Sequence, residues 1–228
     1  MLRLEKDRTC PAMDNRHMQG LFKGILEIFR KPPLALAAFA LLLAYASAHA
    51  SNALLAGFAR FELKLSSDLY GWVAAMYSGG GLIGSVALAC FSNAVRERVL
   101  IAAGTAFLAA ATGGFSTAQT ISEAVLWQGL IGLSFMMIRA GSDVMVLKVV
   151  VNQMVGRVRS NIDAAVGLTA ISIYLLPSLI PDVRIRLIYL GLAGLFACGS
   201  GAIVWAQWTS ATAEQKRLSR SRSGSSLP

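Results

Sequence analysis

Charge is scarce in this chain. Only 14% of its 228 residues are Asp, Glu, Lys or Arg, whereas 55% are hydrophobic and the mean hydropathy is +0.58. A soluble domain of this length usually carries about 25% charged residues. The shortage argues against a soluble globular protein and indicates a chain that lies in a bilayer.

Cysteine is also rare, and its spacing excludes two kinds of site. Cys10, Cys90 and Cys198 form neither a disulfide framework nor a zinc motif. Cys90 and Cys198 fall in apolar stretches, where cysteine acts as a small packing residue. The sequence has no His, Cys and carboxylate cluster with metal spacing and no P-loop. We therefore expect no metal and no cofactor.

Long apolar stretches take up most of the chain. A transmembrane helix needs about 20 predominantly apolar residues, and six stretches meet this need. The expected fold class is an all-α membrane protein in which six transmembrane helices form one bundle over residues 33–208. The stretches are 34–57, 70–92, 99–117, 121–142, 162–180 and 186–208.

The regions outside the bundle are polar or amphipathic. Residues 1–19 are polar and mixed in charge, which is not the pattern of a secretory signal peptide. In residues 20–32 the apolar and charged side chains fall on opposite helical faces, which fits a helix lying in the membrane interface. An ordinary helix packed on the bundle fits equally well. Residues 209–228 form a basic, Ser- and Arg-rich tail, expected to be solvated.

The basic residues are distributed asymmetrically between the two ends of the six spans. Seventeen of the 21 Lys and Arg residues fall on the side that holds both termini, and four fall on the other side. Because cytoplasmic loops carry the excess of Lys and Arg, both termini are expected in the cytoplasm. This distribution favours a lipid bilayer as partner, in a plasma or inner membrane, and argues against nucleic acid.

The second stretch is rich in glycine and is followed by a short basic loop. It reads YGWVAAMYSGGGLIGSVALACFSNAVRERVL, and Gly80 and Gly84 share one helical face. Small residues at this spacing let two helices approach closely. The later stretch NQMVGRVRSNIDAAVG places another tight basic turn at a span boundary.

In motif and order, residues 20–208 resemble a six-helix half of the major facilitator superfamily. In that family a glycine-rich second helix runs into a short basic loop, and a Gly-Arg turn often precedes the fifth helix. The nearest similarity is to drug, macrolide and siderophore exporters. The resemblance implies secondary active efflux of a small organic molecule.

The chain also departs from the family pattern. Members usually have two six-helix halves, and this chain has one. Its loop FSNAVRERVL lacks the Asp after the glycines and the Gly between basic residues that mark an N-terminal half. The resemblance is therefore to a C-terminal half. Transport would require a second half, either another copy or a separately encoded N-terminal half, because the substrate path lies between halves.

Three polar side chains lie in a row within the first span. Tyr45, His49 and Asn52 share a helical face, and polar groups at this depth usually face a bundle interior or a water-filled cavity. The resemblance implies that the first helix lines the substrate path, where His49 could titrate during transport. Alternatively, these groups form structural bonds to a neighbouring helix.

The fourth and fifth spans contribute the other expected path residues. Gln128 and Arg139 follow helical spacing on one face, and Asp143 lies one turn after Arg139, close enough to pair with it. A substrate or gating role for Arg139 is one interpretation; the other is that its side chain snorkels to the interface. Tyr174 of the fifth span completes the expected path.

A cytoplasmic latch is a further expectation. Asp163 follows Arg157 by six residues and could pair with Arg96 or Arg98, holding the cytoplasmic side closed, as the resemblance implies. The alternative is that Asp163 only stabilises a helix N-terminus.

Enzyme functions are not expected. The stretches CGSGA at 198–202 and AGSDV at 140–144 match neither a rhomboid-type nor a presenilin-like protease motif. Two hypotheses therefore remain. The first is a transport protein that works as paired halves. The second is a truncated or vestigial half, either inert or modulating another membrane protein.

Overall fold

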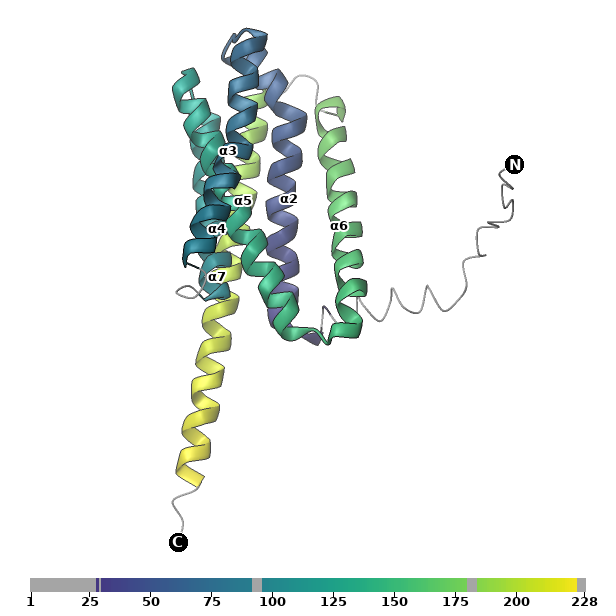
Figure 1. Cartoon of the computed structure of the whole chain (residues 1–228), viewed down its shortest axis with the longest axis vertical. Helices are drawn as coiled ribbons and strands as arrows, with labels where there is room; N and C mark the ends of the chain where they lie inside the picture. Colours follow the sequence, from purple (N-terminus) through teal and green to yellow (C-terminus); the bar gives the residue numbers. More distant parts are fainter. Residues whose placement is uncertain (1–27, 29, 92–95, 180–183, 225–228) are drawn as a thin grey trace, which may run out of the picture.

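The computed structural model describes residues 28, 30–91, 96–179 and 184–224, and these residues are helical apart from short turns (Figure 1). Only the backbone is described at 91, 176–179, 210–211 and 213–224. The expectations for residues 1–19, and for most of the amphipathic segment 20–32, fall outside the described residues.

Six long helices form one bundle, and helices that follow each other in the chain run in opposite directions (Figure 1). The first helix continues into a π-helical turn, η1, at Phe58–Glu62. The long helices are α2 (Pro32–Gly57), α3 (Ser67–Phe91), α4 (Glu97–Thr117), α5 (Ile121–Val149), α6 (Asn152–Leu179) and α7 (Ile185–Gly224).

Local sequence explains where two of these helices begin. Pro32 and Pro33 occupy the first two positions of α2, where a missing N–H costs nothing and the fixed φ favours the helix. The Thr120 side chain caps α5 by accepting a hydrogen bond from the backbone N–H of Glu123 at 3.3 Å. The Glu123 carboxylate in turn accepts from the Gln119 backbone N–H at 2.8 Å, so α5 starts with reciprocal capping.

A few helix pairs dominate the packing of the bundle. α5 packs against both α3 and α4, α4 packs against α7, and α2 packs against α5 and α6. α2 also touches α4 and α7. α5, which packs against α2, α3 and α4, therefore lies at the centre of the bundle.

Five of the six helices are long and apolar enough to cross a membrane, and these indicate a membrane-embedded protein. They are Pro32–Glu62, Ser67–Cys90, Glu97–Thr117, Ile121–Val149 and Ile185–Thr209. The sequence predicted a sixth span at 162–180, within α6. The last residues of that stretch, 176–180, lie outside the residues whose side chains are described, so the sixth span stays a prediction.

Two helices extend beyond the apolar stretches from which they were predicted. α5 continues from the expected end at 142 to Val149, so Asp143 lies within the helix and not after it. α7 continues past residue 208 to Gly224, and this part projects beyond the bundle (Figure 1). Charged residues need not end a helix when they form ion pairs. In α5, Asp143 pairs with Arg159 and Lys148 pairs with Glu97.

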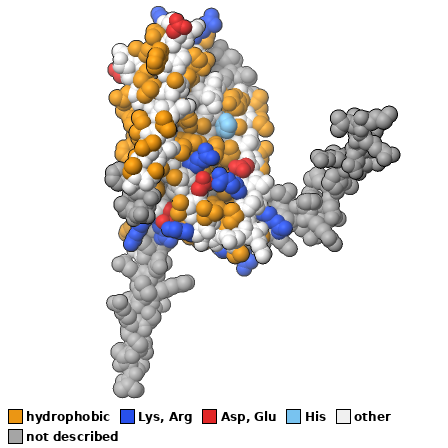
Figure 2. Space-filling view, in the orientation of Figure 1, with side chains coloured by type: hydrophobic (Ala, Val, Ile, Leu, Met, Phe, Trp, Pro, Cys, Tyr) orange, Lys and Arg blue, Asp and Glu red, His pale blue; other side chains and the backbone are white. Residues whose placement is uncertain are grey.

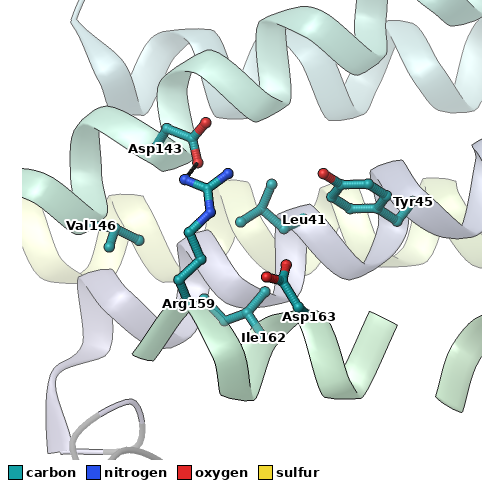
Figure 3. Close-up of a pocket in the computed structure, with 7 residues that line it drawn as sticks. All are labelled: Leu41, Tyr45, Asp143, Val146, Arg159, Ile162 and Asp163. Carbon is teal, nitrogen blue, oxygen red and sulfur yellow. Dashed lines mark hydrogen bonds and ion pairs between the residues drawn. The ribbon is translucent and has the colours of Figure 1, made fainter. Parts of the chain in front are cut away.

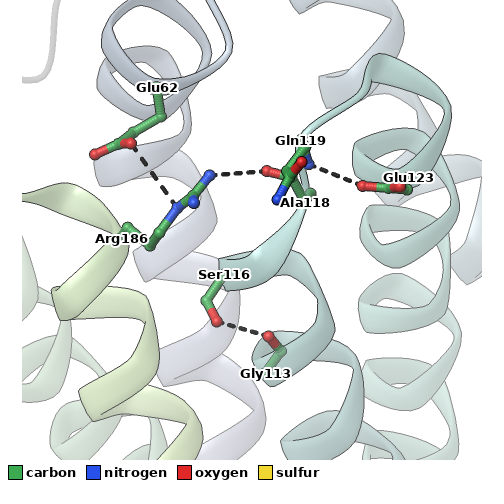
Figure 4. A network of polar contacts seen from close by, with 7 residues as sticks. All are labelled: Glu62, Gly113, Ser116, Ala118, Gln119, Glu123 and Arg186. Atoms are coloured by element: carbon green, nitrogen blue, oxygen red, sulfur yellow. Dashed lines mark hydrogen bonds and ion pairs between the residues drawn. The ribbon is translucent and has the colours of Figure 1, made fainter.

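Aromatic and polar contacts hold helices together at the end of the bundle where α2 ends and α7 begins. The rings of Phe58, Phe115 and Tyr189 meet with centroids 4.8–5.5 Å apart, and all three side chains are buried. At the same end of the bundle, Arg186 Nη2 donates a hydrogen bond to the Ala118 carbonyl oxygen at 3.0 Å (Figure 4). These contacts join α2, α4 and α7 at one point.

Candidate functional site

One face of the bundle carries polar side chains among apolar ones. Figure 2 shows a histidine and a group of arginine and acidic side chains surrounded by hydrophobic ones on this face. The polar face comprises α2, α5 and α6. It holds Tyr45, His49, Asn52, Arg139, Asp143, Arg159, Asp163 and Tyr174, all at least partly accessible.

An ion pair between two helices lies at the centre of the polar face. The Asp143 carboxylate of α5 accepts a hydrogen bond from Arg159 Nη1 of α6 at 3.0 Å (Figure 3). Arg139 Nε of α5 lies 3.9 Å from the other carboxylate oxygen. Leu41 and Tyr45 of α2 form one wall of the adjoining pocket. The pocket holds about 10 Å³, room for about one water molecule. In this conformation the ion pair fills the site.

The charges follow the same spacing on both helices. Arg139 and Asp143 are four residues apart on α5, and Arg159 and Asp163 are four residues apart on α6. Residues at this spacing are neighbours on a helix surface. Asp163 lines the pocket beside Asp143 and Arg159 (Figure 3). Each of these two arginines therefore has a carboxylate within reach on its own helix. The hydrogen bond that Arg159 donates to Asp143 connects the charged residues of α6 with those of α5.

Aromatic rings continue the polar face away from the charges. The Tyr45 ring meets Phe135 of α5 edge-on at a centroid distance of 5.2 Å, and Phe135 also lies 6.0 Å from the ring of Tyr77 on α3. One turn further along α2, the His49 ring lies 5.8 Å from that of Tyr174 on α6. Tyr45 and His49 thus face different neighbours, α5 and α6.

The structure places His49 and Asn52, two polar residues of the first span, differently. His49 is partly buried, and its Nδ1 has no hydrogen-bond partner among the described residues. Asn52 is exposed on the polar face. Exposing an amide side chain to lipid costs free energy because its hydrogen bonds are not satisfied there. Water or a polar partner removes that cost.

Gln128 lies apart from the other expected path residues. Its side chain is 1% exposed, inside the bundle, and its Oε1 has no hydrogen-bond partner in the described part of the chain. Helical spacing with Arg139 suggested a common face, but α5 packs against α2, α3 and α4, and Gln128 lies on a side that these helices cover. The structure therefore does not bring Gln128 to the charged pocket.

The two glycines of the second stretch lie where α3 crosses α5. A Cβ added at Gly80 would overlap the carbonyl group of Gly129, and one added at Gly84 would lie 3.3 Å from Met136 Cβ. From the other side, a Cβ at Gly132 would overlap the carbonyl oxygen of Tyr77. Glycine on both helices is what permits this approach.

The expected latch takes a different form. Asp163 makes no ion pair with Arg96 or Arg98 in the described residues. Arg96 is the residue that precedes α4, and its side chain makes no capping hydrogen bond. The Arg98 backbone carbonyl accepts a hydrogen bond from the Gln207 side chain of α7. α6 packs along α2, away from that turn. Arg157 is exposed on α6. The ion pair that joins α6 to another helix is the one between Asp143 and Arg159.

Two cross-bundle ion pairs were not anticipated from the sequence. Lys148 at the end of α5 binds Glu97 at the start of α4, with Nζ and Oε2 2.9 Å apart. At the opposite end Arg186 Nε lies 3.8 Å from Glu62 Oε2, an ion-pair separation too long for a hydrogen bond (Figure 4). Both join residues distant in the chain, and only the opposite charges of residues at the same end of the bundle could have suggested them.

The described residues contain no group of three or more His, Cys, Asp or Glu side chains that could hold a metal ion. No protein-family profile matches the chain, and no curated protein matches it. Function is therefore inferred from the geometry of the polar face.

Proposed function

We propose that this chain is one six-helix half of a facilitator-type membrane transport protein, and that its polar face lines a path completed by a second half. The observation that carries the proposal is that Asn52, His49 and the ion pair between Asp143 and Arg159 are at least partly accessible on one face of a largely apolar bundle. Polar groups at membrane depth usually face a cavity or a protein partner.

The contact between α2 and α5 supports this proposal. Facilitator halves contain two inverted three-helix repeats, with substrate sites near the bilayer midplane at repeat interfaces. Here α2 and α5, the first and fourth of the six described helices, pack against each other, and both contribute to the polar face. They correspond to the first and fourth helices of a half, which the sequence resemblance implies to be path-lining.

The remaining surface fits a lipid environment. Large apolar side chains are exposed on the outer helices, including Leu82 of α3, Phe107 of α4 and Trp205 of α7. In the proposed assembly these faces contact lipid in a plasma or inner membrane, with both termini in the cytoplasm, while the polar face contacts the second half. The substrate is a small organic molecule, exported by secondary active transport, and no catalytic residue, metal or cofactor is assigned.

A paired expression experiment tests the proposal. Cells producing the chain alone, and cells producing it with a separately encoded six-helix half, are loaded with a panel of fluorescent organic molecules, and efflux is followed. We expect retention of at least one molecule to fall in one of these strains, and the Asp143→Asn, Arg159→Gln double variant to abolish this effect. Unchanged retention of every molecule, in both strains, favours the alternative of a half without transport activity.

A further inference from the structure

A large apolar groove lies between α2 and α6, separate from the charged pocket. Its volume is about 460 Å³, within the range of about 300–1,000 Å³ that is common for small-molecule sites. No residue of α5 lines it, and its walls include the exposed side chains of Phe39 and Leu168, so it opens at the surface of the bundle. The lining residues are Ile28, Ala35, Ala38, Phe39, Leu42, Asn161, Ile162, Ala164, Ala165 and Leu168.

Not every pair of helices in this bundle leaves a groove. Between α3 and α5 the seam is closed, because Gly80 meets Gly129 and Gly132 meets Tyr77 at the backbone. Between α2 and α6 the small residues are alanines that line an open space.

The chemistry of the groove changes along its length. Its walls are apolar except for Asn161, whose side chain is 8% exposed. On α6, Arg157 precedes Asn161 by four residues, and Ala165 and Leu168 follow on the same helical face. Arg157 is exposed, one helical turn before Asn161. The apolar groove therefore ends beside a basic side chain.

We propose that this groove binds one acyl chain of an anionic phospholipid, with the headgroup at Arg157. A basic residue beside a membrane helix attracts an anionic headgroup and contributes about 1 kcal/mol. A lipid chain is thin enough for the space. An α-helix is not, because a 10 Å length at a diameter of 10–12 Å fills about 800 Å³ or more.

Lipid titration of the full chain tests this site. The chain is purified in a non-ionic detergent, delipidated and titrated with dioleoyl phosphatidylglycerol or dioleoyl phosphatidylcholine, and bound lipid is counted by native mass spectrometry. We expect the first phosphatidylglycerol to bind about fivefold or more tightly than phosphatidylcholine, and Arg157→Gln to lower its affinity about fivefold. Arg157 is exposed, so this variant leaves the helix packing intact.

A second variant separates the groove from general lipid binding. Ala164→Leu places a larger side chain in the groove and should reduce phosphatidylglycerol retention about tenfold or more. Ala87→Leu, on the exposed face of α3, adds the same atoms elsewhere and should change nothing. Equal affinities for the two lipids, or full retention by a folded Ala164→Leu variant, would overturn the proposal. So would a parent chain that retains no phosphatidylglycerol.

Discussion

Asp143 on α5 and Arg159 on α6 form the ion pair that joins these two helices, with 3.0 Å between Oδ1 and Nη1. α6 otherwise packs along α2, and beyond their seam lies the apolar groove. The pair is thus well placed to set how firmly α6 is held. Both side chains are partly exposed, which limits the stabilisation to about 1 kcal/mol.

The repeated spacing of the charges makes this contact replaceable. In an Asp143→Asn variant, Arg159 can turn to Asp163, four residues further along its own helix. We therefore expect Asp163→Asn to cost little in the parent and about 0.5 kcal/mol more in the Asp143→Asn background. Thermal unfolding of the two single variants and the double variant in detergent measures this coupling. Strictly additive effects would show that Arg159 does not change partner.

The glycine contact between α3 and α5 gives a prediction with a matched control. Gly80→Ala brings a Cβ into the Gly129 carbonyl and should destabilise the chain by about 1–3 kcal/mol or prevent folding. Gly84→Ala should be milder, because its nearest neighbour, Met136 Cβ, would lie 3.3 Å away. Gly79→Ala meets only Met76 of its own helix at 3.7 Å and should stay within about 0.5 kcal/mol of the parent.

The yield and melting temperature of the three glycine variants are the measurement. A Gly80→Ala protein as stable as the Gly79→Ala protein would mean that α3 and α5 do not touch at this point.

The helices themselves were largely predictable because the apolar stretches are long and uninterrupted. The stretches at 99–117 and 186–208 begin within two residues of α4 and α7. The predicted end of the fourth span at 142 is too early, because the polar residues after 142 do not end α5. Lys148, near the end of α5, instead binds Glu97.

The composition of the site was harder to predict than the helices. Tyr45 and Arg139 were found by helical spacing, but the same spacing also selected Gln128, which is buried. Spacing shows which residues share a face and not what covers that face. Arg159 was missed as a site residue because its partner, Asp143, lies on a different helix, and only the path of α6 beside α5 brings them together.

The arrangement of the helix ends predicts the topology of the chain in the membrane. We expect a reporter fused after Trp208 to be cytoplasmic, and one inserted at Ser66, between η1 and α3, to be external. The reason is that the end with Lys148 and Arg157 carries most of the basic residues. Alkaline phosphatase and green fluorescent protein fusions distinguish the two sides. An external C-terminus would contradict the proposed orientation.

His49 distinguishes a transport role from a structural one. If His49 contacts substrate, His49→Ala abolishes transport by the assembled protein and leaves its membrane abundance unchanged. If the ring serves only to pack against Tyr174 at 5.8 Å, abundance falls instead. Tyr174→Phe keeps that ring contact and serves as the control. Quantitative immunoblotting of membranes, alongside efflux, reports both quantities.

The central claim is that the polar face borders water or a second half and not lipid, and cysteine labelling tests it most directly. Asn52 and Leu190 are matched, because both are exposed and each lies five residues inside its helix at the same end of the bundle. Single cysteines are placed at these positions in a chain whose Cys10, Cys90 and Cys198 are replaced by serine, and membranes are treated with a charged maleimide. We predict that Asn52→Cys reacts about tenfold or more faster than Leu190→Cys, because a thiol surrounded by lipid stays protonated and unreactive. Equal protection of both cysteines would place Asn52 against lipid and contradict the proposed path.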